Sequence, residues 1–508
     1  MSVKNNIIAN FVGRVWSGVL ALIFIPLYIK FIGIEAYGLI GIYASLLVLF
    51  SVLDMGLSTT LNRELSRLST LKDKYQEAKD LVRTFEMIYW CVGIIISVVL
   101  IVSAPVIAHH WLNAQGLSVK TVTVALRIMG GLIAFQWPIA LYSGGLMGLQ
   151  RQVLLNVVRI IAATLQGCGV ILVLWLISPT IYAYFIWQII ITAFLVLTLA
   201  VCLWISLPKA TGQAHFRKQV LINNWKFATG LLGITLLTTV LTQLDKLVIS
   251  KMLTLKVFGY YALATTVAGI LQYIANPLFS ALFPRFSQLV AEKKEEDLIT
   301  LYHKGCQFLY IMVIPLWIVV ALFSKELMSF WIRDPSTVER SYFLVSLIIT
   351  GTAFNAIMLL PFALQLAYGW TKLSFYKNVF AVIIFIPLLI LLVTNYGAAG
   401  AAIAWIALNI GYFLFEIPIM HSRLLRNEMW RWYFVDVGLP LLSCLFIGIL
   451  GRIFMPDNMS VFFILVWIFI VLILSMSFSA LVMPFVSEWL RRMYNSIMFH
   501  ISRGIRES

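Results

Sequence analysis

Residues 180–206 read TIYAYFIWQIIITAFLVLTLAVCLWIS, and this stretch decides the fold class. It contains no charged residue, and it is longer than the about 20 mainly apolar residues that an α-helix needs to cross a membrane. The rest of the chain is similar in composition, because 61% of its 508 residues are hydrophobic and 11% are charged. A soluble globular chain carries about 25% charged residues. The composition therefore excludes a soluble enzyme, a secreted disulfide scaffold and a disordered chain, and it predicts a polytopic helical membrane protein.

Similar apolar segments recur along the whole chain. Gln150-Arg151 and Ser178-Pro179-Thr180 divide two apolar runs that are each too long for one crossing. The predicted spans are 8–32, 37–60, 83–107, 121–148, 152–177, 180–206, 222–250, 256–284, 301–324, 341–367, 373–394, 398–420, 433–453 and 460–485. The sequence therefore predicts an all-α fold with about 14 transmembrane helices.

The positions of lysine and arginine predict the orientation in the membrane. If the N-terminus is inside, the inner loops and tails hold 22 of these residues and the outer loops hold 8. Basic residues concentrate in cytoplasmic loops of membrane proteins. We therefore expect both termini in the cytoplasm. The net charge of +16 then reflects the inner membrane surface, and it does not indicate a nucleic-acid partner.

An offset of 221 residues reveals an internal repeat. Tyr37-Gly38 aligns with Phe258-Gly259, and Arg151 aligns with Lys372. This spacing is typical of two six-helix bundles with the same orientation, which can rock to expose a cavity to either side. We expect an N-terminal six-helix lobe (1–206), a cytoplasmic linker (207–220), a C-terminal six-helix lobe (221–424), and two additional helices with a cytoplasmic tail (425–508).

Several basic residues fall inside predicted spans. Arg14, Arg127 and Arg159 lie deep, where a charge costs at least about 2.5–3.5 kcal/mol unless it faces a partner or water. Lys377, near the start of a span, either joins them or extends to the membrane surface. We expect these four residues to form a cationic, substrate-binding cavity. Arginine suits a phosphate or diphosphate ligand, because its planar guanidinium binds two oxygens and keeps its proton.

Acidic residues inside spans are candidates for coupling or for ion pairing. Asp54, Asp245 and Glu416 lie within predicted spans. A carboxyl group in apolar surroundings can bind a proton, which suits H⁺ or Na⁺ coupling, but a structural ion pair explains these residues equally well. Glu86 and Asp436 lie near span ends, where we expect water to reach them.

The sequence lacks catalytic, metal-binding and nucleotide-binding motifs. It has no G-x-x-x-x-G-K-[ST], no H-E-x-x-H and no G-x-S-x-G. The five cysteines are scattered and form no ligand-like pair. We therefore expect neither an enzyme nor a metal or cofactor site.

The stretch LIFIPLYIKFIGIEAYGLIGIYASLLVLFSVLDMGLSTTLNREL (22–65) resembles the first two helices of bacterial polysaccharide transporters, the Wzx-type flippases. TQLDKLVISKMLTLKVFGYYALATTV is similar to the seventh and eighth helices of this family, with Asp245 and Gly259 matching its pattern. The family belongs to the multidrug/oligosaccharidyl-lipid/polysaccharide exporter superfamily. The resemblance implies two six-helix lobes around a central cavity, and a flippase that moves an undecaprenyl-diphosphate-linked oligosaccharide across the bacterial cytoplasmic membrane by alternating access.

The implied cargo is an O-antigen or exopolysaccharide repeat unit. The implied partners are this lipid-linked sugar, membrane lipid, and a glycan polymerase and chain-length regulator. A multidrug exporter of the same superfamily and a flippase for the peptidoglycan lipid precursor remain alternatives. The excess of deep arginine argues against the exporter, which would favour an acidic pocket for cations.

Overall fold

The computed structural model describes residues 3–208, 212–219, 232–456 and 460–484. The described residues are α-helical with short 3₁₀ and π segments, and they contain no β-strand beyond one isolated bridge. Within these described ranges, ten helices are long and apolar enough to cross a membrane, and an eleventh span results if α10 and α11 are counted together. The all-α polytopic prediction is therefore confirmed, and the number fourteen stays a prediction.

Two long helices are interrupted at single glycines. α1 (Val3–Ser51) breaks at Gly33, with φ 79° and ψ 162°, and α16 (Thr371–Gly411) breaks at Gly397, with φ 59° and ψ −136°. Residues with a side chain rarely adopt these backbone angles. Both breaks fall where the sequence predicted the boundary between two spans. Each long helix therefore contains parts of two predicted spans.

The chain forms two compact units. The first comprises Met1–Leu263 and Asn378–Ala398, and the second comprises Ala264–Lys377 and Ala399–Ser508. The predicted lobe boundaries, the arrangement of the lobes around a central cavity, and the opening of the seventh span at 222–231, which lies outside the described residues, stay predictions.

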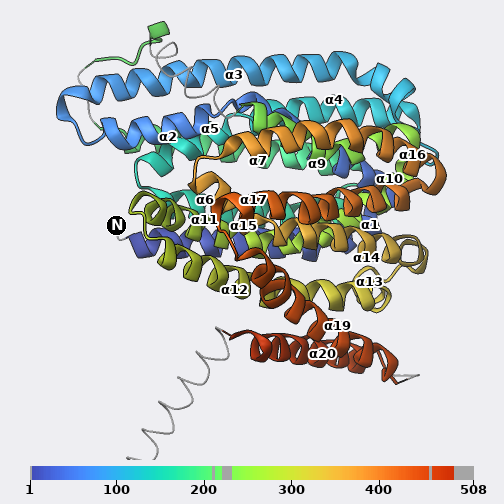
Figure 1. The fold of residues 1–508 in the computed structure, drawn as a ribbon. Helices are drawn as coiled ribbons and strands as arrows, with labels where there is room; N and C mark the ends of the chain where they lie inside the picture. Colours follow the sequence, from blue (N-terminus) through green and yellow to red (C-terminus); the bar gives the residue numbers. More distant parts are fainter. Residues whose placement is uncertain (1–2, 209–211, 220–231, 457–459, 485–508) are drawn as a thin grey trace, which may run out of the picture. The chain divides into compact units, whose positions relative to one another are not determined.

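The first unit is built from closely packed helix pairs (Figure 1). α3 (Tyr75–Val106) packs on α4 (Val119–Gln136), and α2 (Leu57–Leu68) packs on α5 (Ile139–Gly148). α6 (Gln152–Leu176) packs between α1 and α7 (Ile181–Ser206), and α9 (Leu232–Met252) contacts α1. Leucines and aromatic residues of α2, α3, α5 and α7 form a continuous core, including Leu61, Phe85, Tyr142 and Leu203.

A segment of the predicted cytoplasmic linker binds to α3. The buried carboxylate of Asp80 accepts a hydrogen bond from the His215 backbone and pairs with Arg217 at 2.6 Å. The Arg217 backbone N–H donates to the Thr84 hydroxyl at 3.0 Å. These contacts hold the chain against α3 at the predicted inner surface.

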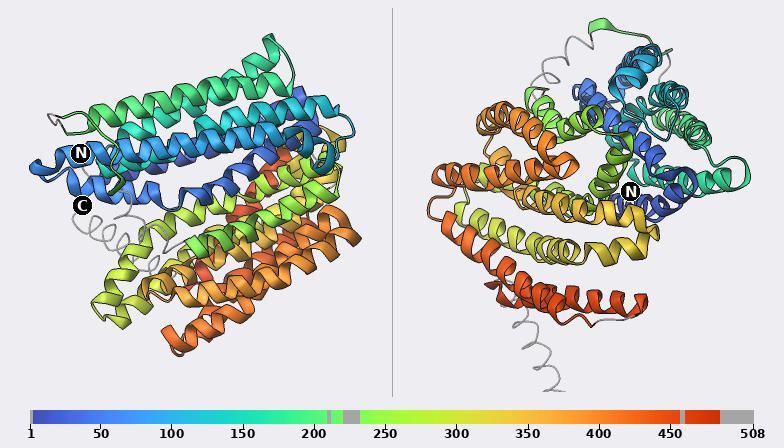
Figure 2. Two further views of the ribbon diagram at one scale, coloured as in Figure 1. Left: turned by 90° about the horizontal axis from the view of Figure 1, so that it is seen from above. Right: turned by 90° about the vertical axis from the view of Figure 1, so that its right-hand side faces the viewer.

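The second unit is centred on α12 (Glu295–Leu322). It packs on α11 (Ile270–Ala291), α14 (Pro335–Ile357) and α19 (Leu439–Ile453). α15 (Leu359–Ala367) packs on α11, and α13 (Ser324–Ile332) packs on α14. α20 (Val461–Val482) packs on α19, and the right view of Figure 2 shows these red helices at the bottom. The second unit also contains π-helix η4 (Tyr412–Glu416), α17 (Ile417–Leu424), α18 (Met429–Arg431) and π-helix η5 (Trp432–Gly438). α10 (Leu255–Ala268) belongs to the first unit up to Leu263 and to the second unit from Ala264.

Candidate functional site

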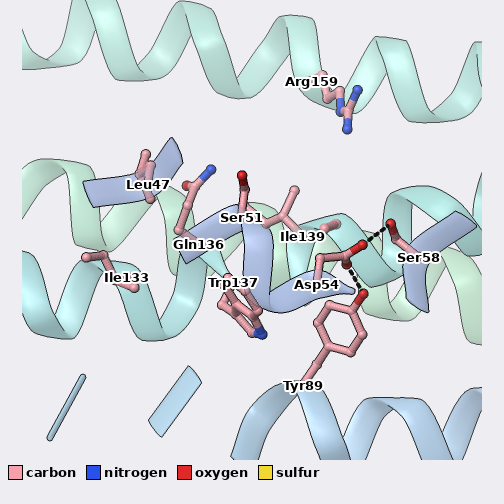
Figure 3. Close-up of a pocket in the computed structure, with 11 residues that line it drawn as sticks. Leu47, Ser51, Asp54, Ser58, Tyr89, Ile133, Gln136, Trp137, Ile139 and Arg159 are labelled. Carbon is pink, nitrogen blue, oxygen red and sulfur yellow. Dashed lines mark hydrogen bonds between the residues drawn. The ribbon is translucent and has the colours of Figure 1, made fainter. Parts of the chain in front are cut away.

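A cavity of about 420 Å³ with both polar and apolar lining residues lies within the first unit (Figure 3). Its walls come from α1, the short 3₁₀ segment η1 (Val52–Asp54), α2, α3, α4, α5 and α6. The lining residues are Leu47, Ser51, Asp54, Ser58, Tyr89, Ile133, Gln136, Trp137, Ile139, Ala140 and Arg159. The structure thus brings together one deep arginine and one deep aspartate that the sequence predicted to be functional.

A helix break places Asp54 in this cavity. The sequence predicted one continuous span over 37–60, but the helix ends at Ser51, and α2 starts only at Leu57. Met55 and Gly56 have left-handed backbone angles, with φ of 49° and 76°. The break ends the regular hydrogen bonding of the helix and lets the Asp54 carboxylate lie beside α2 and α3.

Both oxygens of the Asp54 carboxylate accept hydrogen bonds. The Ser58 hydroxyl donates to Oδ2 at 2.9 Å, and the Tyr89 hydroxyl donates to Oδ1. Figure 3 shows both donors on the α2 and α3 side of the carboxylate. These two hydrogen bonds fix the position of the carboxylate at the cavity wall.

Arg159 projects from α6 on the opposite side of the cavity, as Figure 3 shows. Its Nη2 donates to the Ser143 hydroxyl at 2.8 Å. Ser143 belongs to α5, so this bond orients the guanidinium towards the cavity wall that α5 forms. The side chain is exposed in the protein, which fits a group that meets a solvated ligand.

The aromatic wall of the cavity is formed by Trp137 and Tyr89, whose ring centroids lie 6.1 Å apart. Trp137 follows α4 directly, and Pro138 separates α4 from α5. Proline cannot donate a backbone hydrogen bond, which interrupts the helix at this point. Aromatic faces of this kind can contact sugar rings as well as pack against helices.

The other predicted cavity cations are placed differently. Arg127 is exposed on α4 and is not among the residues that line this cavity. Arg14 lies in α1, but its side chain is outside the part of the chain that the structure describes. The assignment of these two residues to a substrate cavity stays a prediction.

Lys377 and Glu416 form a buried ion pair in the second unit. The Lys377 ammonium lies 2.6 Å from both carboxylate oxygens of Glu416. Gln365 donates a further hydrogen bond to Glu416 at 2.7 Å, and the Tyr412 ring lies 4.6 Å from the ammonium. Glu416 is only 3% exposed. In this structure, Glu416 is therefore a pairing acid, and its partner is Lys377.

Asp245 is also buried and hydrogen-bonded. The Tyr261 hydroxyl donates to one carboxylate oxygen at 2.6 Å, and the Lys246 ammonium lies 3.3 Å from the other. Asp54 and Asp245 thus share one arrangement, in which a tyrosine hydroxyl holds a carboxylate within the helices. No sequence signal pointed to Tyr89 or Tyr261 as the donors.

The expectation that water surrounds Glu86 and Asp436 was wrong. Glu86 is 8% exposed and accepts hydrogen bonds from Tyr142 at 2.8 Å and from Trp204 at 3.2 Å. Asp436 is fully buried and contacts His303 and Gln307. Both carboxylates pack against a neighbouring helix, because the helices extend beyond the predicted span ends.

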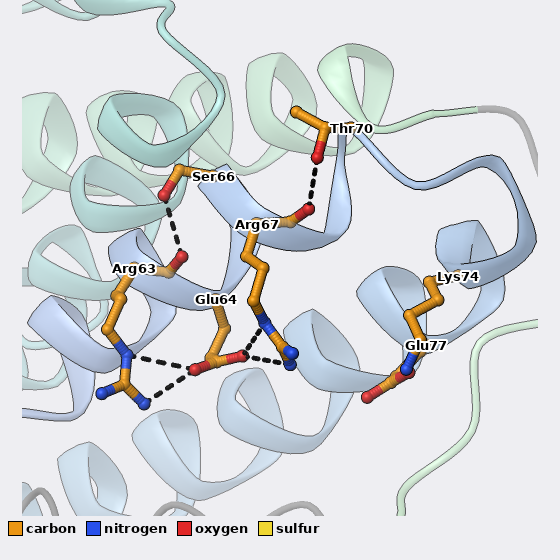
Figure 4. A network of polar contacts seen from close by, with 7 residues as sticks. All are labelled: Arg63, Glu64, Ser66, Arg67, Thr70, Lys74 and Glu77. Atoms are coloured by element: carbon orange, nitrogen blue, oxygen red, sulfur yellow. Dashed lines mark hydrogen bonds and ion pairs between the residues drawn. The ribbon is translucent and has the colours of Figure 1, made fainter.

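The predicted inner end of α2 carries a compact charged group, shown in Figure 4. Arg63 and Arg67 bind the two oxygens of Glu64 at 2.7 and 2.8 Å. The side chains of both arginines remain about half exposed, at 50% and 58%. The group presents positive charge at the surface while its carboxylate is almost buried. No cluster of three or more metal-ligating side chains was found within the described ranges.

Comparison with known proteins adds two family matches. Residues 3–290 match the family described as polysaccharide biosynthesis protein, and residues 231–391 match the MatE family. A Shigella flexneri protein named "Putative O-antigen transporter" is 22% identical over 409 residues, which are 80% of this chain and 94% of that protein.

Solved structures of transporters share the fold. The lipid II flippase MurJ in an inward closed conformation aligns with a TM-score of 0.70 at 15% identity, covering 94% of this chain and 98% of that one. A multidrug resistance MATE family transporter of the MOP superfamily, in an inward-facing conformation, aligns with a TM-score of 0.60 at 13% identity, covering 83% of this chain and 96% of that one.

Proposed function

The chain belongs to the polysaccharide biosynthesis protein family and is a membrane transporter rather than an enzyme, and from this premise we propose its cargo and its mechanism. The cargo is an undecaprenyl-diphosphate-linked oligosaccharide, either an O-antigen or an exopolysaccharide repeat unit. The protein moves it across the bacterial inner membrane by alternating access. The Shigella flexneri relative supports the choice of a lipid-linked glycan.

The observation that carries this proposal is the position of Arg159 across the cavity from Asp54 (Figure 3). A guanidinium binds two phosphate oxygens at once and keeps its charge at neutral pH. Asp54 is already bound by Tyr89 and Ser58, so its carboxylate has donors of its own. Arg159 therefore binds the diphosphate of the cargo in our proposal.

The size of the cavity limits which part of the cargo it holds. Ligand pockets of about 300–1,000 Å³ enclose a molecule of ordinary drug size. A cavity of about 420 Å³ therefore suits the diphosphate and the adjoining sugar, but not a whole oligosaccharide with its lipid. In this proposal, the polyprenyl tail stays in the bilayer, and Trp137 contacts the first sugar ring.

The proposed energy source is an ion gradient that acts through Asp54. A proton on this carboxylate removes its negative charge from the wall that faces Arg159. Protonation and binding of an anionic cargo are then linked, because each changes the electrostatic free energy of the other. Na⁺ is the alternative coupling ion. A glycan polymerase and a chain-length regulator are the proposed consumers of the translocated cargo.

Reconstitution in lipid vesicles tests this function. Vesicles with the purified chain should move an undecaprenyl-diphosphate-linked oligosaccharide to the opposite leaflet faster than protein-free vesicles do. A cationic dye should not be transported. Dye export without lipid-linked sugar movement would reject the proposal in favour of the multidrug exporter, and movement of only the peptidoglycan lipid precursor would favour that flippase.

A further inference from the structure

Two equivalent helices of the internal repeat cross one another within the first unit. The segment of α1 that follows Gly33 packs against the first half of α10. A Cβ atom added at Gly38 would lie 2.7 Å from the backbone oxygen of Leu255, and one added at Gly259 would contact the backbone oxygen of Ile34. Neither position accepts a side chain unless the two backbones move apart.

The contacts at this crossing are symmetric. The offset of 221 that aligns the halves pairs Ile34 with Leu255, and Gly38 with Gly259. Gly38 meets Leu255, while its counterpart Gly259 meets the counterpart of Leu255, which is Ile34. A contact is isologous when one residue meets a second residue of the partner while the equivalent pair makes the same contact in the opposite sense. Such a contact lies on the two-fold axis that relates the partners. The crossing therefore lies on the pseudo-two-fold axis of the repeat.

The segment between α3 and α4 forms hydrogen bonds with one side of this crossing, at the junction of α9 and α10. The Leu255 backbone N–H donates to the carbonyl of Asn113 at 2.8 Å. Trp111 donates to the Ser250 hydroxyl at 2.9 Å, and Lys251 donates to the carbonyl of His110. Three bonds thus attach residues 110–113 to the end of α9 and the start of α10.

The same segment also forms hydrogen bonds with the other helix of the crossing, α1. The carboxylate of Glu35 accepts the backbone N–H groups of Gln115 at 2.7 Å and Gly116 at 2.8 Å. Glu35 lies just after the break at Gly33, which is the repeat counterpart of the α9–α10 turn. Residues 110–116 therefore bridge the two equivalent turns at the predicted outer surface.

The helix that forms the crossing also reaches the cavity. Leu47 and Ser51 of α1 line the cavity, nine and thirteen residues after Gly38. At a rise of 1.5 Å per residue, Leu47 is about 13 Å further along the helix. The crossing and its loop therefore lie between the predicted outer surface and the cavity.

We propose that this crossing is the outer closure of the transport path, and that Gly38 and Gly259 are its positioning residues. The inference rests on the proposed function. The glycines set how closely the two equivalent helices approach, and residues 110–116 hold them together. Release of the cargo to the outside requires these bonds to open and the helices to separate.

A reversible disulfide tests the closure. Asn113 and Thr254 form an isolated parallel bridge, which places their backbones within the range that a disulfide spans. In a chain whose five natural cysteines are replaced by alanine, N113C/T254C should form a disulfide under mild oxidation. Translocation should fall at least tenfold and should return when a reductant is added. Each single-cysteine variant is the control and should not respond to oxidation.

A second readout needs no cargo. After oxidation of the N113C/T254C pair, a third cysteine at Leu47 should not react with a membrane-impermeant thiol reagent added on the side that carries residues 110–116. It should react after reduction. If labelling responds to the disulfide while neither form moves the lipid-linked sugar, the proposed cargo is wrong and the closure stands. Failure of the disulfide to form, or full transport and labelling by the oxidised chain, would overturn the closure.

The glycines can be tested separately. G38A and G259A should each shift labelling at position 47 towards the reactive state and should do so to a similar degree, because the two sites are equivalent. G131A is the matched control, since its Cβ would lie 3.7 Å from Ile189, an ordinary contact. Labelling of G38A and G259A at the level of G131A would reject the positioning role.

Discussion

The ion pair between Lys377 and Glu416 predicts a large and specific loss of stability. In E416Q the ammonium of Lys377, whose side chain is 19% exposed, faces a neutral amide and the Tyr412 ring. Removing one partner of a buried pair costs about 3–5 kcal/mol, because the remaining charge is left uncompensated. The partial exposure of Lys377 places the expected loss near the lower figure, about 3 kcal/mol.

The double variant K377M/E416Q separates the interaction energy of the ion pair from the effects of the single substitutions. Replacing both charges of a buried pair is often neutral or stabilising. We therefore expect K377M/E416Q to recover at least about 2 kcal/mol relative to E416Q, which a double-mutant cycle measures as coupling. Unfolding in mixed micelles with increasing SDS gives the free energies.

The control is E339Q, because Glu339 and Lys325 form a pair whose side chains are 60% and 53% exposed. It should leave stability unchanged. An E416Q variant as stable as E339Q, or a double variant no more stable than E416Q, would refute the reasoning. Loss of translocation by a stable K377M/E416Q protein would assign this pair a role in transport.

Three further predictions concern single sites. D334A should cost about 1 kcal/mol, because Asp334 caps α14 by accepting from the Thr337 N–H at 3.0 Å. Hydrogen bonds from Thr337, of which the side-chain bond has the largest effect, lower the pKa of Asp334. This stabilisation is therefore present above the unfolded-state pKa and is lost as pH falls through the folded-state pKa. Unfolding midpoints that depend equally on pH in D334N and in the native chain would contradict it. G33A should lower the free energy of unfolding by about 1–3 kcal/mol, because Gly33 has a positive φ. G411A is the control and should show no comparable loss, because a Cβ at Gly411 would meet open space. Equal unfolding midpoints of G33A and G411A would contradict the need for glycine at the helix break. D54N should translocate at a rate independent of an imposed pH gradient, and a rate that follows the gradient as in the native chain would exclude Asp54 as the proton site.

Span boundaries marked by a distinctive residue could be predicted from the sequence. The gaps 33–36 and 395–397 between predicted spans contain Gly33 and Gly397, where the helices break. Glycine adopts backbone angles that other residues avoid, so a single glycine in the sequence can indicate a helix break. The break at Met55 and Gly56 was not predicted, because it lies inside a predicted span, where a single glycine does not distinguish a break from a continuing helix.

The internal repeat stays a prediction, which rests on a spacing in the sequence alone. The structure adds a contact to the alignment of Gly38 with Gly259. Gly38 lies against Leu255 and Gly259 lies against Ile34, and the same offset aligns Ile34 with Leu255. Sequence alone showed that the positions are equivalent, and it contained nothing about their contact.

Partners of buried charges could not be predicted. Lys377 and Glu416 are 39 residues apart, and Tyr89 is 35 residues from Asp54. Depth in a span identifies a charge that needs a partner, since an uncompensated charge there is costly. Which side chain supplies it depends on how the helices pack. The same limit explains Glu86, where distance from the span end did not reveal the contacts with Tyr142 and Trp204.

The initial rate of lipid-linked oligosaccharide translocation by R159Q vesicles tests the central claim most directly. A hydrogen bond to a charged group contributes about 1.5–3 kcal/mol, so the rate should fall about tenfold to a hundredfold. R159K should be intermediate, because it keeps the charge without the planar guanidinium. R151Q, at the exposed start of α6, should match the native chain. A rate for R159Q equal to that of R151Q would contradict the assignment of Arg159 as the diphosphate-binding residue.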